Sequence, residues 1–258
     1  MDEYQFIVLT KENHAGVITI NREDKMNALN RKLLQEIKHA VRTFEVDDQV
    51  HGIILTGKGE KAFAAGADIA EFANYSPKEG KAMSAEGHDV MYAIEKCSKP
   101  IVAAINGYAL GGGNELSMAC HLRIASPNAI FGQPEVKLGL PPGYGGTQRL
   151  IQLVGKSKAL EMNLTGKNID ANEAHRIGLI NEIVEKEHLM SYCFQLIATF
   201  TKRSPLAMAS VIQCTNAYFS EQNGHEMEIN SFGNSFQTED FTEGTRSFLD
   251  KTKANFRS

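Results

Sequence analysis

Residues 101–116 read IVAAINGYALGGGNEL (Ile-Val-Ala-Ala-Ile-Asn-Gly-Tyr-Ala-Leu-Gly-Gly-Gly-Asn-Glu-Leu). The first five, Ile101–Ile105, form a short apolar run of the kind that is buried in a parallel sheet. An Asn-Gly pair closes this run, and three glycines then open a short helix, predicted over 111–119. Ligands of open α/β sheets bind beyond the carboxyl ends of the strands. The stretch therefore predicts an α/β fold and also the place of a functional site.

The sequence before this stretch also alternates between strand and helix signals. Gly52–Thr56 is a second apolar run, and Pro77–Cys97 carries apolar residues on one helical face. A strand, a long helical crossover and a second strand together predict a right-handed parallel unit. Nearer the N-terminus, Tyr4–Thr10 and Val17–Ile20 are rich in β-forming residues. Asn30–Phe44 has apolar residues at helical spacing, with Asn30 as its N-cap.

The sequence after residue 145 is mainly helical. Leu122–Ala125, Ala129–Phe131 and Ile180–Val184 read as further short strands. We therefore expect an α/β core with the active site over residues 1–190 and a helical C-terminal part over 191–258. The predicted helices are Gly145–Val154, Lys156–Thr165, Ala171–Ile177, Glu187–Thr201, Pro205–Glu221, Gly224–Gln237 and Thr242–Phe256.

The composition excludes several classes of protein. Among 258 residues, 27 are Lys or Arg and 31 are Asp or Glu, which argues against a globally cationic nucleic-acid binder. No window approaches 18 apolar residues, so we expect no membrane span. The N-terminus lacks the pattern of a secretory signal, and the four cysteines form no C-x-x-C pair. We expect reduced thiols, a cytoplasmic location and, because the histidines show no ligand spacing, no metal.

Small residues gather at three places where a predicted strand ends, namely 64–68, 107–115 and 132–146. Small residues let a ligand approach the backbone closely. Free N–H groups at the start of a helix suit an oxygen atom that becomes negative. Two such groups form an oxyanion hole, in which the loss of one donor costs roughly 10² to 10³ in rate. The clusters therefore predict stabilisation of an oxyanion.

Two glutamates accompany these clusters. Glu115 lies in the first turns of the glycine-opened helix, and Glu135 stands between Pro134 and Val136. Apolar surroundings raise the pKa of a carboxyl group towards the range that suits general acid–base catalysis. Either glutamate could instead be a capping or ion-paired residue, and the sequence does not show that the two face each other.

Two other functions have some support in the sequence. Gly57–Ala62 matches the dinucleotide pattern G-x-G-x-x-A after a predicted strand, although no strand ending in an acidic residue follows about 20 residues later. Arg31, Lys32 and Lys38 could form a local RNA-binding face, although Glu36 and the acidic balance favour an ordinary solvated helix. The sequence contains neither G-x-S-x-G, nor a phosphate-binding G-x-x-x-x-G-K-[ST], nor H-E-x-x-H.

Taken together, the motifs resemble the crotonase, or enoyl-CoA hydratase/isomerase, superfamily over nearly the whole chain. The resemblance implies an α/β crotonase-like spiral of repeated ββα units with a helical C-terminal trimerisation part, assembled as a homotrimer or a homohexamer. It also implies an acyl-CoA thioester as substrate and no separate cofactor, because coenzyme A belongs to the substrate. The matching segments are Asn27–Leu29, Phe63–Ile69, Lys99–Leu116, Phe131–Glu135, Gly145–Leu150, Leu164–Gly166 and Lys253–Phe256.

The resemblance also implies roles for single residues. The amides of Ala67 and Gly112 match those that hold the thioester oxygen, and Gly143 matches a glycine beside the attacking water. Lys25 matches a position near the CoA end of the substrate. The acyl-CoA is expected to run past Ala65, Gly66, Ala67 and Asp68.

The two glutamates indicate the subfamily. Short-chain hydratases of this family have carboxylates at both matching positions, so Glu115 and Glu135 imply reversible hydration of trans-2-enoyl-CoA to 3-hydroxyacyl-CoA. One is expected to act as base towards water, and Glu135 to deliver the proton to the α-carbon. The alternative on the same fold is Δ3-Δ2-enoyl-CoA isomerisation. Glu23 and His121 depart from the usual proline and aspartate, and the acyl chain length stays open.

Overall fold

Over residues 4–220 and 222–256, which the computed structural model describes, the larger of two sheets has six strands. Their spatial order is β1-β2-β3-β5-β7-β10. The first two strands form an antiparallel hairpin, and all other neighbours are parallel. The strands are β1 (Ile7–Glu12), β2 (Ala15–Ile20), β3 (Gly52–Gly57), β5 (Ile101–Ile105), β7 (Leu122–Ala125) and β10 (Glu182–Ile183).

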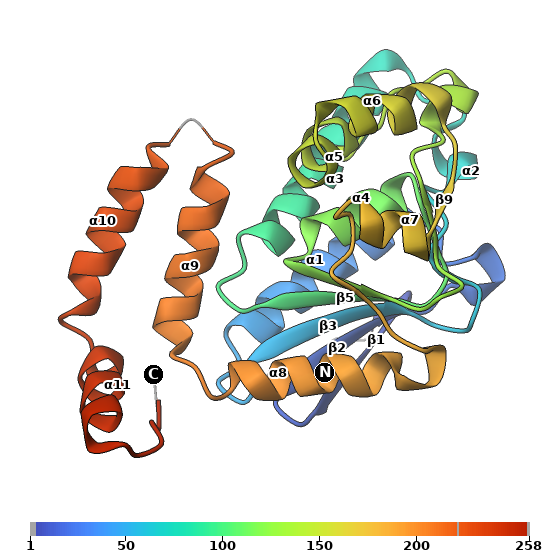
Figure 1. Ribbon diagram of the computed structural model, residues 1–258. Helices are drawn as coiled ribbons and strands as arrows, with labels where there is room; N and C mark the ends of the chain where they lie inside the picture. The colour runs from blue at the N-terminus through green and yellow to red at the C-terminus, as the bar shows by residue number, and fades with distance from the viewer. Residues whose placement is uncertain (1–3, 221, 257–258) are drawn as a thin grey trace.

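A second, smaller sheet has the order β4-β6-β8-β9. The chain passes from β3 to β4, from β5 to β6 and from β7 to β8, so each step leads from the large sheet to the small one. Helices follow each pair, which confirms the expected spiral of ββα units (Figure 1). The strands of the small sheet are β4 (Ala62–Ala64), β6 (Tyr108–Leu110), β8 (Ile130–Gly132) and β9 (Ile169–Asp170).

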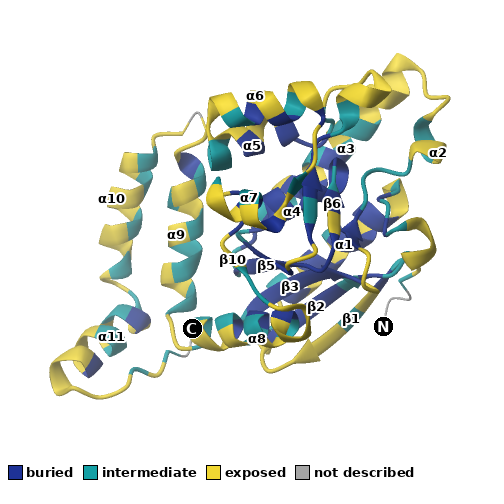
Figure 2. Cartoon of the chain, turned by 45° about the vertical axis from the view of Figure 1, so that its right-hand side comes forward, coloured by how far each residue is buried: buried dark blue, intermediate teal, exposed yellow. Residues whose placement is uncertain are grey.

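Apolar layers cover both faces of the large sheet. Ile53 and Leu55 point into the main core, beside residues of α1 (Arg31–Glu45) and α3 (Pro77–Glu95). Ile54 points the other way and packs with Cys193 and Ile197 of α8 (Leu189–Phe200). Because both sides are covered, the strand is a continuous apolar run rather than an alternating one. Figure 2 shows the central strands β3 and β5 buried. The domain division at residue 190 stays a prediction, although α8 packs on this sheet.

Short helices connect the strands around the site. The helix α4 (Gly112–Ala119) is buried over its whole length. The 3₁₀ helix η2 (Glu135–Leu138) follows β8. The other short helices are η1 (Glu23–Lys25), α2 (Ile69–Phe72), α5 (Gly146–Val154), α6 (Lys156–Thr165), α7 (Ala171–Arg176) and η3 (Lys186–His188).

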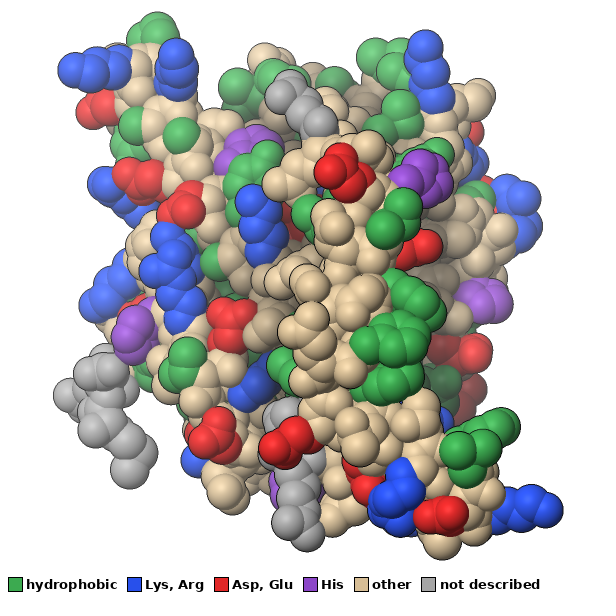
Figure 3. All heavy atoms as spheres, turned by 90° about the vertical axis from the view of Figure 1, so that its left-hand side faces the viewer, with side chains coloured by type: hydrophobic (Ala, Val, Ile, Leu, Met, Phe, Trp, Pro, Cys, Tyr) green, Lys and Arg blue, Asp and Glu red, His purple; other side chains and the backbone are tan. Residues whose placement is uncertain are grey.

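Three helices extend to one side of the core (Figure 1). They are α9 (Pro205–Ala217), α10 (Gly224–Ser235) and α11 (Glu239–Asp250). Figure 3 looks onto this side and shows apolar side chains at its surface. Ile229 is 70% exposed, Phe232 69% and Phe248 83%. Within the part of the chain that the structure describes, no helix is long and apolar enough to cross a membrane.

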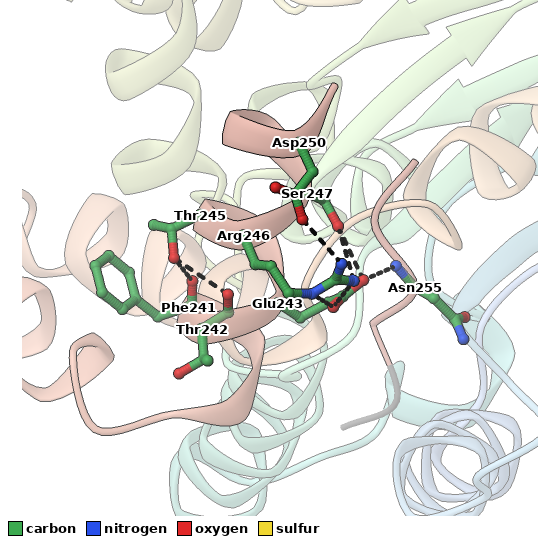
Figure 4. Close-up of polar contacts among 8 residues, drawn as sticks. All are labelled: Phe241, Thr242, Glu243, Thr245, Arg246, Ser247, Asp250 and Asn255. Atoms are coloured by element: carbon green, nitrogen blue, oxygen red, sulfur yellow. Dashed lines mark hydrogen bonds and ion pairs between the residues drawn. The ribbon is translucent and has the colours of Figure 1, made fainter. Parts of the chain in front are cut away.

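The last helix ends earlier than the sequence predicts. The prediction of helix over Thr242–Phe256 is wrong after Asp250, because Lys251 adopts a left-handed conformation with φ of 56°. Glu243 then holds the following segment, since its Oε1 accepts the Asn255 N–H at 2.9 Å (Figure 4). Arg246 pairs with the other oxygen of Glu243 at 2.6 Å and helps to hold the pKa of that carboxyl at about 2. The Glu243 side chain thus gives the Asn255 N–H an acceptor beyond the end of the helix.

Other predicted boundaries also needed correction. The first strand is shifted to Ile7–Glu12, and its turn contains Asn13 and His14 in the left-handed region. The strands β4 and β6 were not predicted, because their small residues have weak β-propensity. Glu221, the predicted end of a helix, lies outside the described residues.

The structure removes the basis of the dinucleotide-binding hypothesis. A G-x-G-x-x-A fingerprint must open a helix directly after a strand. Here β3 ends at Gly57, and a turn leads into the strand β4. Gly59 has φ of 81°, and a Cβ on it would lie 2.2 Å from the Glu23 carboxylate. These glycines therefore form a connection between two strands.

The basic residues of α1 contact neighbouring polar groups. Arg31 pairs with Glu86, Lys32 donates to the Gln5 side chain, and Lys38 pairs with Asp89. Cations held in such pairs are less available to neutralise phosphates. The face is therefore that of an ordinary solvated helix.

His121, one of the two departures from the family pattern, has a local structural role. Its Nδ1 accepts the Ile101 N–H at 2.9 Å, and its Nε2 lies 3.1 Å from the Glu95 carbonyl oxygen. Burial lowers its pKa, so the neutral ring fits this position. The ring links the first residue of β5 to the end of α3.

Candidate active site

The helix α4 packs so tightly that only glycine fits at its start. A Cβ on Gly113 would lie 1.9 Å from the carbonyl oxygen of Ala64. Gly111, which precedes the helix, has φ of 48°. The glycine run therefore brings the N-terminus of α4 against β4, and it places Glu115 on the first turn.

Glu115 is only 1% exposed, and the loop before α5 fixes its orientation. Its Oε1 accepts the N–H groups of Tyr144 at 2.8 Å and Gly146 at 2.6 Å. Gly146 is the first residue of α5, so the carboxylate lies at the positive end of a helix. Burial and the nearby charge of Glu135 nevertheless raise the pKa of Glu115 to about 7, against the lowering effect of both amides.

Arg149 supports the loop from behind. Its Nη1 donates to the Tyr144 carbonyl oxygen at 3.0 Å, and its Nη2 pairs with Glu95 at 2.8 Å. The side chain of Arg149 is 5% exposed. A buried cation therefore ties the loop that binds Glu115 to the end of α3.

Glu135 has different surroundings. It begins η2 directly after Pro134, and neither of its buried carboxylate oxygens has a hydrogen-bond partner among the described residues. Burial raises its pKa. A Cβ on Gly111 would lie 2.8 Å from its Oε1. The carboxyl group thus borders the glycine turn that opens α4.

The amides of Ala67 and Gly112 lie close together. A Cβ on Gly112 would be 3.5 Å from the Ala67 nitrogen. A parallel bridge to Leu29 uses the Gly66 carbonyl and the Asp68 N–H. The backbone hydrogen bonds of the described residues give the N–H groups of Ala67 and Gly112 no acceptor. Two neighbouring amides are therefore available to a ligand.

One cavity of about 540 Å³ brings these groups together. Phe72, Leu138 and Leu140 supply apolar surface to it. A mostly apolar cavity with a few convergent polar groups is typical of a small-molecule site. The sequence-predicted residues that line it are Ala65, Gly66, Ala67, Gly112, Glu115, Glu135 and Gly143.

Two sequence-predicted residues do not line this cavity. Asp68 pairs with Arg22 at 2.8 Å. Lys25 is exposed on η1. Asp68 and Lys25 therefore lie in segments beside the cavity and not in its wall.

The groups that hold Glu115 were not predicted from the sequence. The Pro-Pro-Gly-Tyr-Gly-Gly run of 141–146 was recognised as a glycine cluster, but not as the source of two donors to Glu115. Tyr144 also fills the space between α3 and α4, where its ring lies against Gly87 and Gly112. The sign of this role in the sequence was an aromatic residue, Tyr144, within a run of glycines. Its partners are far away in the sequence.

The described residues contain no group of three or more His, Cys, Asp or Glu side chains arranged to hold a metal ion.

The chain is similar to several known proteins over nearly its whole length. A sequence model described as enoyl-CoA hydratase/isomerase matches residues 10–258. A crotonyl-CoA hydratase from Syntrophomonas wolfei is 45% identical over 99% of both chains. A short-chain-enoyl-CoA hydratase from Clostridium acetobutylicum is 42% identical over 97% of both chains. The crystal structure of an enoyl-CoA hydratase from Bacillus anthracis superposes with a TM-score of 0.92 at 34% identity, over 98% of this chain and 99% of that one.

Proposed function

The chain belongs to the enoyl-CoA hydratase/isomerase family, and we propose that it catalyses the reversible hydration of trans-2-enoyl-CoA to 3-hydroxyacyl-CoA. This is the activity of an enoyl-CoA hydratase, a hydro-lyase, as in its named relatives. The observation that carries the proposal is that Glu115, Glu135, Ala67 and Gly112 line one cavity.

The amides of Ala67 and Gly112 bind the thioester oxygen. When water adds to the β-carbon, negative charge moves through the α-carbon onto this oxygen and gives an enolate. Two fixed N–H groups stabilise that charge without reorganisation, and one of them lies at the start of α4. This interaction is stronger in the transition state than in the substrate, as catalysis requires.

The two carboxyl groups divide the proton transfers. Glu115 removes a proton from the water while the water oxygen bonds to the β-carbon. Glu135 delivers its proton to the α-carbon, and the carbon–carbon double bond becomes single. Exchange with solvent then returns both groups to their starting states. Gly143, whose carbonyl oxygen accepts the Ser84 hydroxyl at 2.7 Å, lies beside the water.

The surroundings of the carboxyl groups support this assignment. Two amides stabilise the ionised form of Glu115, which a base requires. Glu135 lacks such donors among the described residues, so no amide there favours the ionised form over the protonated form that an acid requires. The different environments separate two otherwise similar groups into a base and an acid.

The reaction as written needs no redox partner, because the elements of water add without any net oxidation. Coenzyme A enters as part of the substrate. We assign its binding to the segment Ala65–Asp68, at the edge of the cavity, with Lys25 nearby on η1.

Isosteric variants of the two glutamates test the proposal. Glu115→Gln and Glu135→Gln should each lower the turnover of trans-2-butenoyl-CoA by roughly 10² or more, within the range of general acid–base catalysis. Acyl-CoA binding, measured by calorimetry, should be largely kept. Glu60→Gln, at an exposed pair with Lys186, is the matched control and should retain full turnover. Near-normal hydration by both active-site variants would contradict the assignment.

Isotope transfer separates hydration from isomerisation. In water enriched in ¹⁸O, a hydratase places the label in the 3-hydroxyl group of the product. An isomerase that moves the double bond leaves the product unlabelled. Conversion of a 3-enoyl-CoA without incorporation of the label would favour the isomerase.

We further assign the exposed apolar side chains of α9–α11 to a homotrimer or a homohexamer built from two trimers. Exposed aromatic and aliphatic residues at this density favour an interface between copies. The bacterial relatives support a cytoplasmic location.

A further inference from the structure

A second cavity lies next to the catalytic one. Its volume is about 140 Å³, and Arg31, Glu71, Glu79 and Glu86 contribute charged groups to its lining. Three residues line both cavities, namely Tyr75, Met83 and Tyr144. We call these three residues the wall.

One part of the wall is rigid. The ring of Tyr144 fills the space between α3 and α4, because a Cβ on Gly87 would lie 2.1 Å from its Cδ1 and a Cβ on Gly112 3.2 Å from its Cδ2. Tyr144 is only 4% exposed. Met83, on α3, is half-buried against the core. The unbranched Met83 side chain is therefore the most adaptable part of the wall.

The wall lies close to the reacting atoms. Tyr144 touches the Gly112 position with its ring and donates its N–H to Glu115. A thioester held by Gly112 and Ala67, with its double bond between the two glutamates, directs its alkyl end away from the oxyanion hole. Met83 and Tyr75 line the α3 side of the cavity, so an alkyl end directed to that side would meet them.

The space behind the wall is unsuitable for an alkyl chain. Arg31 pairs there with Glu86 at 2.5 Å, and its backbone N–H donates to Glu71 at 2.9 Å. Glu79 forms the capping box of α3. An alkyl chain that passed the wall would separate these charged groups from water without offering them any hydrogen bond, which is unfavourable.

We propose that Tyr75, Met83 and Tyr144 close the acyl pocket and that these three side chains set the longest acyl chain that the enzyme accepts. The proposal rests on the proposed function and adds its substrate class. Met83 is the residue that determines the limit, because it stands between the two cavities and has no hydrogen bond to lose.

The experiment measures kcat/KM for trans-2-butenoyl-, hexenoyl-, octenoyl- and decenoyl-CoA. For the wild type, kcat/KM should fall by at least about tenfold between butenoyl- and decenoyl-CoA, because a chain too long for the closed pocket displaces the reacting atoms, and a small misplacement already has this effect. Met83→Ala should raise the decenoyl-to-butenoyl ratio about tenfold or more. Tyr75→Ala, at a partly exposed position that tolerates truncation, should change the ratio in the same direction.

Two controls keep the interpretation specific. Met83→Leu conserves the side-chain volume and should keep the wild-type ratio. Leu160→Ala truncates a partly exposed apolar side chain of α6 that lines neither cavity, and it should leave the ratio unchanged.

The outcomes separate this proposal from the function on which it rests. If the wild type hydrates decenoyl- and butenoyl-CoA equally well, or if both enlarged-pocket variants keep the wild-type ratio, the wall does not limit the chain. If the wild type hydrates none of the four substrates, the proposed function itself fails.

Discussion

At the residue scale, two identical side chains differ because their hydrogen-bond partners differ. Glu115 accepts two amide N–H groups, whereas Glu135 has no partner among the described residues. Burial raises the pKa of both groups, and the charge of Glu135 raises that of Glu115 further. The site thus holds two carboxyl groups whose pKa values are both raised, and the pKa of Glu115 reaches about 7.

The burial of Glu115 should also affect stability. Its folded pKa of about 7 lies above the ordinary value of 4.5, so its contribution to stability is fully present below 4.5 and is lost as the pH rises through 7. Glu115→Gln keeps an oxygen acceptor for both amides and removes the ionisation. The free energy of unfolding of the variant should therefore rise relative to that of the wild type from pH 5 to pH 8, by on the order of 1–3 kcal/mol.

Urea denaturation at pH 5 and at pH 8 measures this change in the free energy of unfolding. Glu60→Gln, at an exposed site, is the control and should show no such pH-dependent gain. A Glu115→Gln variant that is equally destabilised at both pH values would show that ionisation of this carboxyl group is not linked to folding.

At the element scale, α5 carries a positioning function. Its first N–H group binds Glu115, and Arg149 of its second turn holds the Tyr144 carbonyl and Glu95. One short helix therefore contacts both Glu115 and the end of α3. The glycines around residue 145 allow this approach, because Gly145 has φ of 103° and a Cβ there would lie 2.2 Å from the Arg149 guanidinium.

Variants of Arg149 should separate its charge from its shape. Arg149→Met leaves Glu95 unpaired and should lower stability by about 3–5 kcal/mol. Because Arg149 lowers the pKa of Glu115, its loss should shift the acidic limb of the kcat/KM profile to higher pH. Arg149→Lys keeps the charge and should keep the limb in place.

Arg176→Met is the control variant, because it removes an exposed cation that does not contact the loop before α5. A pH profile of Arg149→Met that matches the wild type would limit Arg149 to a purely structural role. The double variant Arg149→Met/Glu95→Gln should recover part of the stability, since it removes the unpaired charge.

At the scale of the whole molecule, the core and the C-terminal helices differ in what they bury. The large sheet is covered on both faces, whereas α10 exposes Ile229 and Phe232 by 70% and 69%. Figure 2 shows the same contrast between a buried centre and an exposed helical side. The exposed apolar surface of the single chain is the basis for the proposed assembly.

Charged substitutions on α10 should disrupt this assembly. Light scattering of the wild type should give three or six times the chain mass of 28.4 kDa. The double variant Ile229→Glu/Phe232→Glu should shift the particle towards single chains, because it places charge in an apolar contact. Val46→Glu, which replaces an equally exposed apolar residue after α1, should leave the mass unchanged. An α10 variant with the wild-type mass would contradict the proposed interface.

The sequence predicted most of the long elements but not the short ones. The strand Ile101–Ile105 and the Asn30 cap of α1 were predicted correctly, because apolar spacing and capping act locally. The strands β4 and β6 were missed, because Ala and Gly have weak β-propensity and these strands form only through pairing. The donors to Glu115 were missed for a related reason, since Tyr144 and Gly146 are distant from it in the sequence.

The sequence by itself determined the α/β class, the family and the glutamates and glycines that belong to the site. These depend on residue type and order. Only the tertiary structure decided that Glu115 is held by amides and Glu135 is not, and that Met83 separates the cavity from a charged one. The hydrogen bonds, the burial and the pKa of a group depend on which distant segments pack against it, and local sequence does not specify these neighbours.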